Sequence, residues 1–562
     1  MSLIMGIDTG GTFTDTVIWD AEHKKVIAKS KVFTTGTDLS VGIKSGISAL
    51  NFDDFQLIEQ VNISTTLTVN SILENRIDKV AVLVIGKHVL GKLPAHRKYE
   101  IVKDNYNKKR GIYRMPPEEM KGICQYLGNE SKYILVSAFG EDSISTEDQV
   151  AGILRNYFDC YILCRHCMST KENFYESTLD AITTAALRNV VQHWYESVRK
   201  NLDKFGIGEN VRVLTGSGKL STAEEVIQNP LLTLMSGPIA SFIGSRYLTN
   251  EPDYLLVDMG GTSFDIMKVQ NRETRFASTA TDIGGYRYGI EMLDIQSFAV
   301  GGDSKIRYNS MGEFIVEPQR VTPLCLLGDS YPHLLEELQE YNSLYSGDLL
   351  TASFTDCFFR AKVKPSEGKL LETGKKFLQI IEEQPHSLFC LAEKVGVQPD
   401  ALHVDQLIEK GYIYCASLTP TDIIHAEGIS GRWNRDISTV AVKIMAEMKG
   451  WDVDTFVAEV KKRIAEKMAY CCMQSIAHFE DKCFTFEDST AARFIMDSFL
   501  KPGKDLIGTN FSIRKPIVGV GAPAGMWLPR VAEMLDARLV LPRDGDVAGA
   551  VGAAASGKEV HG

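Results

Sequence analysis

The chain has 562 residues, 44% of them hydrophobic and 24% charged, a composition ordinary for a globular protein with roughly two to four domains. Its formal net charge of −11 argues against a surface that binds nucleic acid or anionic membranes. The first residues lack the basic region and long apolar segment of a secretion signal, and no window is apolar enough to span a membrane. We therefore expect a cytoplasmic protein with no nucleic-acid or membrane partner.

The first predicted element is a β-hairpin within residues 5–15, which read MGIDTGGTFTD. A β-rich run ends at Asp8, Gly10 and Gly11 allow the positive φ angles of a tight turn, and an alternating strand follows. The backbone N–H groups of such a turn, together with the Thr12 hydroxyl, converge into an anion-binding concavity. A phosphate would repel Asp8, but Asp8 can hold a Mg²⁺ ion that bridges to the phosphate.

Up to about residue 170, strand-like runs alternate with helical segments, as in a βαβ domain. The clearest strand-like runs are residues 79–85 and 133–136. Thr65, Thr66 and Asn70 follow another strand-like run and begin a helix, so Ser64 or Thr65 is expected to cap that helix.

The cysteines are scattered, and the only suggestive cluster is Cys160, Cys164 and Cys167 around His166. A structural zinc site needs a second ligand pair at a defined spacing, and none follows nearby. A Cys-x-x-Cys redox motif needs a helix that opens after a strand, which this segment allows. We favour buried, reduced thiols and a structural role for His166.

Apolar residues at helical spacing predict a long helix over residues 173–201, with its apolar face in the core. Such a helix could join two domains, 1–172 and 173–562. The second domain carries a copy of the first motif, because residues 255–266 read LLVDMGGTSFDI. Asp258, Gly260, Gly261, Thr262 and Asp265 repeat the spacing of Asp8, Gly10, Gly11, Thr12 and Asp15. Two copies with identical offsets indicate two phosphate-binding hairpins, one in each domain.

Gly301 and Gly302 form a loop that follows the second hairpin, and we expect it near the γ-phosphate of a bound nucleotide. Residues 306–412 are acidic and helix-rich and are predicted to form an insertion in the second domain. Residues 516–526 read PIVGVGAPAGM, a strand that runs into small residues against which a planar base and ribose could lie. The small residues expected to bind the nucleoside are Gly519, Gly521, Ala522 and Gly525. Residues 544–555 follow as a small-residue helix that can pack close to a neighbour.

Two phosphate hairpins and a nucleoside loop resemble the pattern of the actin, Hsp70 and sugar-kinase superfamily. That resemblance implies an α/β fold of two ribonuclease-H-like lobes around an ATP cleft, with a helical insertion in the second lobe. Several segments resemble, in order, the hydantoinase/oxoprolinase family, of the N-methylhydantoinase A and 5-oxoprolinase type. They are residues 6–15, 64–76, 214–238, 418–422 and 546–554. The chain departs from the family pattern at residues 164–168, where a Ser-His-Glu segment would stand, and after residue 304.

The resemblance implies an ATP-dependent hydrolase that activates and opens a cyclic amide such as a hydantoin or 5-oxoproline. ATP and Mg²⁺ would be the cofactors, with Asp8 and Asp258 organising the metal. Asp15 and Asp265 are candidates for the general base by proximity alone. Thr65, Thr66 and Asn70 would line the substrate side of the cleft, as the alternative to helix capping. The implied partners are a small-molecule substrate, further copies of the chain in a homo-oligomer, and a hydantoinase B-type subunit.

Two other functions are compatible with these residues. A small-molecule kinase of the same fold would phosphorylate a hydroxyl and stop. A nucleotide switch would use its ATP state to control a partner protein, and the insertion at 306–412 is the feature most compatible with that role.

Overall fold

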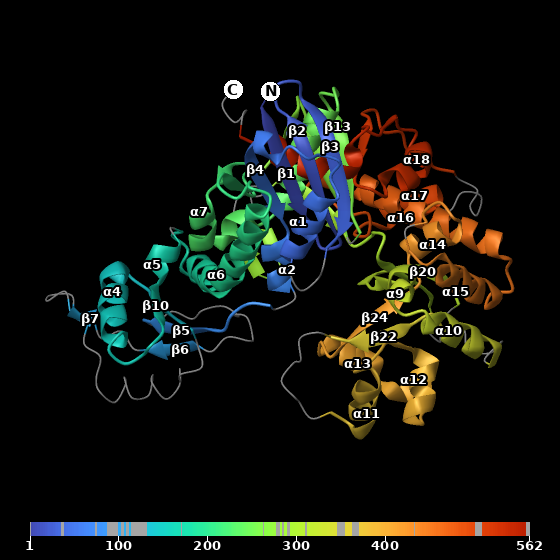
Figure 1. Ribbon diagram of the computed structural model, residues 1–562, viewed down its shortest axis with the longest axis horizontal. Coiled ribbons are helices and arrows are strands. Elements are labelled where there is room, and N and C mark those ends of the chain that lie inside the picture. Colours follow the sequence, from blue (N-terminus) through green and yellow to red (C-terminus); the bar gives the residue numbers. More distant parts are fainter. Residues whose placement is uncertain are drawn as a thin grey trace. The chain divides into compact units, whose positions relative to one another are not determined.

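The computed structural model describes residues 2–34, 39–73, 76–86, 99–102, 106–107, 112–113, 132–169, 171–261, 263–276, 281–283, 286–288, 293–309, 312–344, 354–361, 370–431, 433–500 and 508–557. Thr262 of the second hairpin lies outside these residues. Figure 1 labels the helices and strands of the chain. The chain divides into two compact units. Unit 1 contains residues 1–252, 269–294 and 542–562, and unit 2 contains residues 253–268 and 295–541.

The main sheet of unit 1 begins with the first hairpin. Strands β1 (Leu3–Thr9), β2 (Phe13–Asp20) and β3 (Lys25–Phe33) are antiparallel neighbours. On the other side of β1, strands β4 (Ile58–Thr65) and β11 (Val211–Leu214) are parallel to it, and β12 (Leu220–Ser221) closes the edge. The resulting order is β12-β11-β4-β1-β2-β3. Because β1 is buried along its apolar run, this sheet forms the centre of a core.

Helices cover this sheet and continue the chain of unit 1. They are α1 (Leu39–Ser48), α2 (Leu67–Leu73), α6 (Phe174–Asp203), α7 (Ala223–Gln228), α8 (Ser236–Leu248) and α19 (Ala548–Ala555). The helix predicted over 173–201 is confirmed as α6, and the side chain of Asn173 caps it by accepting from Glu176 N–H. Helix α19 contains only alanine, glycine and valine, so it can approach strand β1 and helix α8 closely.

A smaller parallel sheet in unit 1 has the order β10-β9-β5-β6. Its strands are β5 (Val80–Ile85), β6 (Tyr99–Val102), β9 (Tyr133–Ala138) and β10 (Tyr161–Cys164). The strands predicted at 79–85 and 133–136 are thereby confirmed. Helix α4 (Ser143–Leu154) and the single turn α5 (Arg165–Met168) pack on this sheet, as does α6. Unit 1 also contains the short strands β7 (Tyr106–Asn107), β8 (Ile112–Tyr113), β15 (Glu273–Thr274), β16 (Thr281–Ile283) and β17 (Tyr286–Tyr288).

The main sheet of unit 2 repeats the arrangement of unit 1. Strand β13 (Tyr254–Met259) lies beside β14 (Phe264–Gln270), and β18 (Ile295–Phe298) pairs antiparallel with β14. On the other side of β13, strands β25 (Ile517–Val520) and β26 (Leu539–Val540) are parallel to it. In both units a hairpin, a third antiparallel strand and two parallel strands therefore occur in the same spatial order. The duplicated sequence motif thus reflects a duplicated ribonuclease-H-like sheet.

The rest of unit 2 is larger and mixes helices with short strands. Its helices are α9 (Leu324–Ser330), α10 (His333–Leu344), α11 (Glu372–Ile380), α12 (Leu388–Val395), α13 (Val404–Glu409), α14 (Pro420–Ala426), α15 (Arg435–Glu447), α16 (Val453–Glu480), α17 (Thr490–Leu500) and α18 (Ala524–Met534). Strands β19 (Ser304–Tyr308) and β20 (Phe314–Arg320) form a hairpin. The strands β21 (Thr322–Pro323), β22 (Cys357–Arg360), β23 (His386–Ser387) and β24 (Ile413–Ser417) form a four-stranded sheet. The segment 306–412 thus contains strands as well as the helices expected from its sequence.

The compact units divide the chain at places other than residue 172. Unit 1 continues to residue 252 and takes back the C-terminal helix α19, so the long helix α6 lies within it. Among the described residues, no helix is both long and apolar enough to cross a membrane.

Candidate functional site

The first turn (residues 10–13) is a tight turn, but Gly10 does not have the positive φ that was expected of it. Gly10 N–H donates to the Phe13 carbonyl at 2.9 Å, and the strand register places Asp8 opposite Asp15. Asp8 is half-buried while its neighbours Ile7 and Thr9 are buried, so the strand presents one carboxylate at the edge of a dry core. The prediction of a hairpin with Asp8 just before its turn is confirmed.

Helix α19 lies directly against Asp8. A Cβ atom built on Gly549 would come within 2.2 Å of Asp8 Oδ2, so a larger residue here would displace the Asp8 carboxylate. Asn62, on the neighbouring strand β4, donates from Nδ2 to the Ala553 carbonyl at 2.9 Å and fixes the helix. Gly549 thus lies against a candidate site residue, a contact that the sequence did not predict. The signal was the run of small residues, which predicted close packing but not the partner.

Thr65, Thr66 and Asn70 come together beside the first turn. Thr66 N–H donates to the Thr9 carbonyl at 3.1 Å, and Asn70 Nδ2 donates to Thr66 Oγ1 at 3.1 Å. Thr65 is buried, and its hydroxyl accepts from Leu67 N–H at 3.1 Å, which is the capping role weighed above. The Ser236 hydroxyl donates to the Thr65 carbonyl at 2.8 Å and joins α8 to this cluster. Contact of Thr66 and Asn70 with a substrate stays a prediction.

The second turn (residues 260–263) repeats the first. Gly260 N–H donates to the Ser263 carbonyl at 3.1 Å, and Asp258 is half-buried between buried Val257 and Met259. The nucleoside segment lies beside this hairpin, because β25 pairs with β13 and places Val520 opposite Asp258. Gly521 then has a φ of +88°, and a Cβ atom there would come within 2.1 Å of the Met259 carbonyl oxygen. Glycine is therefore required where the nucleoside segment passes the turn.

The loop of Gly301 and Gly302 also meets the second turn. Asp303 N–H donates to the Gly261 carbonyl at 2.8 Å. Thr421, at the start of α14, holds the loop from the other side, since its hydroxyl donates to the Gly302 carbonyl at 2.8 Å. Three segments far apart in sequence thus converge on one hairpin in unit 2. Thr421 is a positioning residue that the sequence analysis did not find, although residues 418–422 were among the segments that resembled the family.

The buried Asp422 explains why α14 starts where it does. Its carboxylate accepts from the Thr419 hydroxyl at 2.7 Å and from Cys325 N–H at 2.7 Å. Ser438 donates to the same carboxylate at 2.8 Å. Asp422 therefore joins α14, α9 and α15, and it fixes Thr421 at the loop.

The second aspartates of the two hairpins have different surroundings. Asp15 accepts from Lys31 Nζ at 2.5 and 2.6 Å, so its charge is neutralised. Asp265 is 9% exposed and accepts from the hydroxyls of Ser263, at 2.9 Å, and Ser297. Burial, and then the nearby Asp258 carboxylate, raise the pKa of Asp265 to about 6. Of the two general-base candidates, Asp265 has the more suitable environment.

The donors at the two turns fit the expected ligands. Asp8 and Asp258 offer half-buried carboxylate oxygens, which are the hard ligands that Mg²⁺ prefers. Because residues 549 and 521 are glycines, no side chain at these positions fills the space beside the Asp8 and Asp258 carboxylates. Gly519 lies within β25, Ala522 precedes Pro523 at the N-cap of α18, and Gly525 lies in the first turn of that helix. Metal and nucleotide binding by all these residues stays a prediction.

The cysteine cluster does not have the properties of a redox motif. The chain does pass from β10 into the short helix α5 between Cys164 and Cys167. Redox cysteines have lowered pKa values, whereas burial, reinforced by the Glu147 carboxylate, raises the pKa of Cys164 to about 12. The interpretation as reduced thiols is therefore favoured over a redox motif. The expectation that these thiols are buried is correct for Cys164 but wrong for Cys160, which is half-buried, and for Cys167, which is exposed.

Comparison with known proteins fits this geometry. The hydantoinase/oxoprolinase N-terminal region matches residues 4–109, which include the first hairpin. The hydantoinase/oxoprolinase profile matches residues 178–323, which include the second hairpin and the Gly301–Gly302 loop. Both matched regions are similar to the hydantoinase/oxoprolinase family, and they support the family resemblance predicted from the sequence.

Individual relatives are distant. The alpha chain of the caprolactamase of Pseudomonas jessenii is 23% identical over 56% of this chain and 50% of its own length. The chain thus spans about half the length of that curated relative. A nucleotide-free acetone carboxylase structure matches 99% of this chain and 70% of its own chain, with a TM-score of 0.64 and 13% identity. The ATP-dependent caprolactamase structure from P. jessenii matches 98% of this chain and 70% of its own, with a TM-score of 0.55 and 17% identity. These structures confirm the predicted α/β fold class.

Proposed function

We propose that this protein uses ATP to activate a cyclic amide for hydrolysis. In this proposal the backbone N–H groups of both Gly-Gly turns bind phosphate oxygens, and Asp8 and Asp258 hold Mg²⁺. The observation that supports it is the repetition in both units of a half-buried aspartate at the same register before a Gly-Gly turn. One such turn has many explanations, whereas a matched pair suits a ligand with several phosphates.

The choice of a cyclic amide follows from the family and from the named activity of a relative, caprolactamase. Opening an unstrained lactam or hydantoin in water can be unfavourable. Transfer of the γ-phosphoryl group to the carbonyl oxygen, with loss of the amide N–H proton, makes that carbon electrophilic. Water adds to the carbon, and the ring nitrogen then takes up a proton and leaves as an amine, so that the ring opens to an acyl phosphate. A second water hydrolyses the acyl phosphate to a carboxylate and phosphate. The chain's residues would act chiefly by positioning and by stabilising charge.

Within this proposal Asp265 is the better candidate to accept a proton, because its pKa of about 6 lies near neutrality. Asp15 would instead keep Lys31 and strand β3 in place. Thr66 and Asn70 would orient the substrate from the first hairpin, to which Thr66 is hydrogen-bonded.

A screen of ATP hydrolysis by the full chain tests the proposal. Lactams, hydantoins, 5-oxoproline, ketones and sugars would each be added, with and without a co-purifying protein of the hydantoinase B type. We expect a cyclic amide to stimulate release of phosphate in step with ring opening. Stimulation by a sugar with a stable phosphate ester as product would contradict the proposal and indicate a kinase. Slow turnover unaffected by any small molecule would indicate a nucleotide switch.

A further inference from the structure

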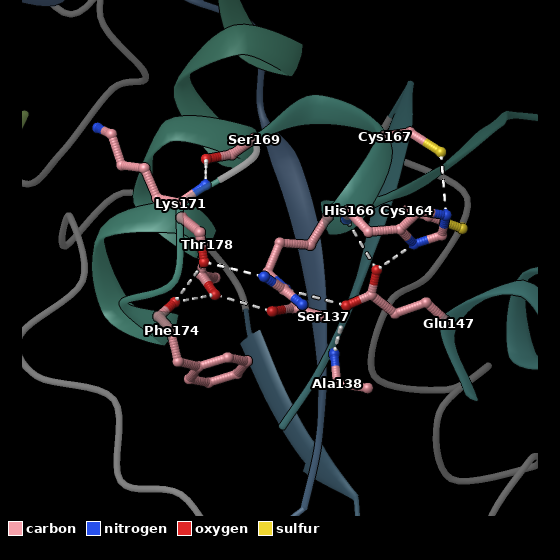
Figure 2. A network of polar contacts seen from close by, with 12 residues as sticks. Ser137, Ala138, Glu147, Cys164, His166, Cys167, Ser169, Lys171, Phe174 and Thr178 are labelled. Carbon is pink, nitrogen blue, oxygen red and sulfur yellow. Dashed lines mark hydrogen bonds and ion pairs between the residues drawn. The ribbon is translucent and has the colours of Figure 1, made fainter. Parts of the chain in front are cut away.

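A second cluster of chemically reactive side chains lies in unit 1, away from the first turn. Strand β10 ends at Cys164, the single turn α5 carries His166 and Cys167, and helix α4 carries Asp148. The ligand atoms of Asp148, Cys164 and His166 all lie within 4.8 Å of one another. Figure 2 shows both sulfur atoms beside the His166 ring.

Three separations in this cluster are close to those around a tetrahedral zinc ion. With bonds of about 2.3 Å to sulfur and about 2.0 to 2.1 Å to nitrogen and oxygen, zinc ligands lie about 3.4 to 3.8 Å apart. Cys167 Sγ lies 3.2 Å from His166 Nε2, and Asp148 Oδ1 lies 3.5 Å from the same nitrogen. Cys164 Sγ lies 3.8 Å from Asp148 Oδ1. Each of these three separations is within about 0.4 Å of its value around zinc. The atoms that all lie within 4.8 Å of one another are those of Asp148, Cys164 and His166, so Cys167 would complete the site by rotation of its exposed side chain.

The histidine is already oriented as a zinc ligand would be. Glu147 is fully buried, and its Oε2 lies 2.7 Å from His166 Nδ1 and accepts from His166 N–H at 2.9 Å. Its Oε1 accepts from Arg165 Nε at 3.0 Å and from Ala138 N–H at 2.9 Å (Figure 2). A carboxylate on Nδ1 fixes the ring so that Nε2 faces the metal, which is the usual support of metal-bound histidine.

We propose that Asp148, Cys164, His166 and Cys167 bind one zinc ion through Oδ1, Sγ, Nε2 and Sγ. The set combines two soft thiolates with an imidazole and a carboxylate, a donor mixture that favours zinc over Mg²⁺ or Ca²⁺. With four protein ligands the site would be structural, and it would tie helix α4 to the end of strand β10. The sequence argument missed it because the remaining ligand precedes the cysteines, on another helix, instead of following them as a second Cys or His pair.

A similar cluster of His and Glu side chains in unit 2 differs from this one, because a lysine lies beside its histidine. His386 Nδ1 lies 2.6 Å from Glu337 Oε1, and His333 is near both. There the Lys394 ammonium lies 3.3 Å from His386 Nδ1 and 3.0 Å from Nε2, so a positive charge already lies beside this ring. At His166 the atoms that face Nε2 are a thiol and a carboxylate oxygen instead.

Cobalt titration of the full chain tests this site. The chain is stripped of metal with a chelator under reducing conditions and then titrated with Co²⁺, which shows thiolate charge-transfer absorption when cysteine binds it. We expect one equivalent of Co²⁺ with that absorption, and its displacement by Zn²⁺. Zinc should also raise the melting temperature of the chain, since it binds only the folded state. A wild-type chain that takes up no cobalt, or takes it up without thiolate absorption, would overturn the proposal.

Four variants assign the ligands. Cys164→Ser and Cys167→Ser should each weaken zinc binding at least about 100-fold in chelator competition, more than loss of a supporting residue usually does. Asp148→Asn changes an exposed side chain and should weaken binding about tenfold. Cys483→Ser, an exposed cysteine outside the cluster, is the matched control and should bind zinc as the wild type does. Unchanged affinity in Cys164→Ser or Cys167→Ser, or a disulfide between the two sulfurs in the chain as purified, would overturn the site.

Discussion

The first and second hairpins share a backbone but differ at one cross-strand position. In β3, Lys31 lies opposite Asp15 and forms an ion pair with it. In β18, the equivalent residue opposite Asp265 is Ser297, and its hydroxyl donates to the carboxylate. The Asp15 charge is therefore neutralised in place, whereas Asp265 is buried with a pKa raised to about 6. The duplicated backbone suits a phosphate-binding role that both hairpins share. The cross-strand partner then decides the role of the second aspartate. Paired with Lys31, Asp15 is a structural residue, whereas Asp265, paired with Ser297, is a candidate proton acceptor.

The largest expected effect concerns what the hairpins share. Asp8→Asn and Asp258→Asn should each lower ATP hydrolysis by about 1000-fold or more, because a magnesium ligand supplies several kcal/mol of charge stabilisation. Asp54→Asn, an exposed residue of unit 1, is the matched control and should keep wild-type turnover. Turnover and melting temperature would be measured for all three variants. Normal hydrolysis in either hairpin variant would show that the two turns do not play matched roles.

Replacement of the glycines that lie beside the two aspartates should have different effects on stability and on ATP hydrolysis. Gly521→Ala places a Cβ atom 2.1 Å from the Met259 carbonyl oxygen, a backbone atom that cannot move aside as a side chain would. Residue 521 also has a φ of +88°, which alanine rarely adopts. We expect it to lower the free energy of unfolding by roughly 2 to 4 kcal/mol. Gly549→Ala meets the Asp8 side chain at 2.2 Å, which can move, so it should lower hydrolysis more than stability.

Gly152→Ala, in helix α4 with open space around it, is the control for both glycine variants. It should raise the free energy of unfolding by about 0.5 to 1 kcal/mol, because alanine favours helix more than glycine does. Chemical unfolding and ATP hydrolysis would be measured in parallel. Equal loss of stability in the two site variants would contradict the distinction between them.

The local features of both hairpins could be predicted from sequence, whereas their surroundings could not. Gly-Gly turns, the preceding aspartates and the long helix α6 depend on residues close in the chain. Thr421 and Gly549 reach their hairpins from segments more than a hundred residues away. The sequence contained the small residues and the Thr-Pro-Thr-Asp segment, but the identity of their neighbours is a property of tertiary packing.

The difference between Asp15 and Asp265 was also outside the sequence argument. Both were candidates by proximity to a turn. The partners Lys31 and Ser297 lie on a third strand, and only the register of that strand shows which residue faces which aspartate. A shift of that third strand by one residue would have turned its side chains to the opposite face of the sheet and put a different residue opposite the aspartate.

Replacing the two second aspartates should change stability in opposite directions. Because the folded pKa of Asp265 is raised to about 6 from its usual 3.8, the folded state holds its proton more tightly than the unfolded chain. Wild-type stability from this group is full below about pH 4 and is lost as the pH rises through about 6, a loss of roughly 3 kcal/mol by pH 7. Asp265→Asn lacks that loss and should be the more stable protein at pH 7.

Asp15→Asn should instead destabilise the protein at pH 7, by about 1 to 3 kcal/mol, because it leaves the half-buried Lys31 ammonium without its carboxylate. Melting temperatures of wild type and both variants, measured without nucleotide or metal between about pH 4 and pH 8, give the comparison. The same sign of change for both variants at pH 7 would show that the cross-strand partners do not distinguish the two aspartates.

The smallest expected effect concerns exposed ion pairs on the two sheets. Lys29 on β3 lies 3.0 Å from Asp544 and 2.7 Å from Asp546, which precede helix α19. Lys268 on β14 lies 2.6 Å from Glu480 at the end of α16, and Glu480 is 69% exposed. Lys29→Met and Lys268→Met should each lower the free energy of unfolding by no more than about 1 kcal/mol, because solvent and salt screen such pairs.

Lys29→Met should show the larger loss of stability, since Asp544 is only 22% exposed. Raising the salt concentration should narrow the difference in the free energy of unfolding between each variant and the wild type. A loss well above this range in Lys29→Met, insensitive to salt, would mean that the pair holds α19 against the first hairpin and is not a weak surface contact.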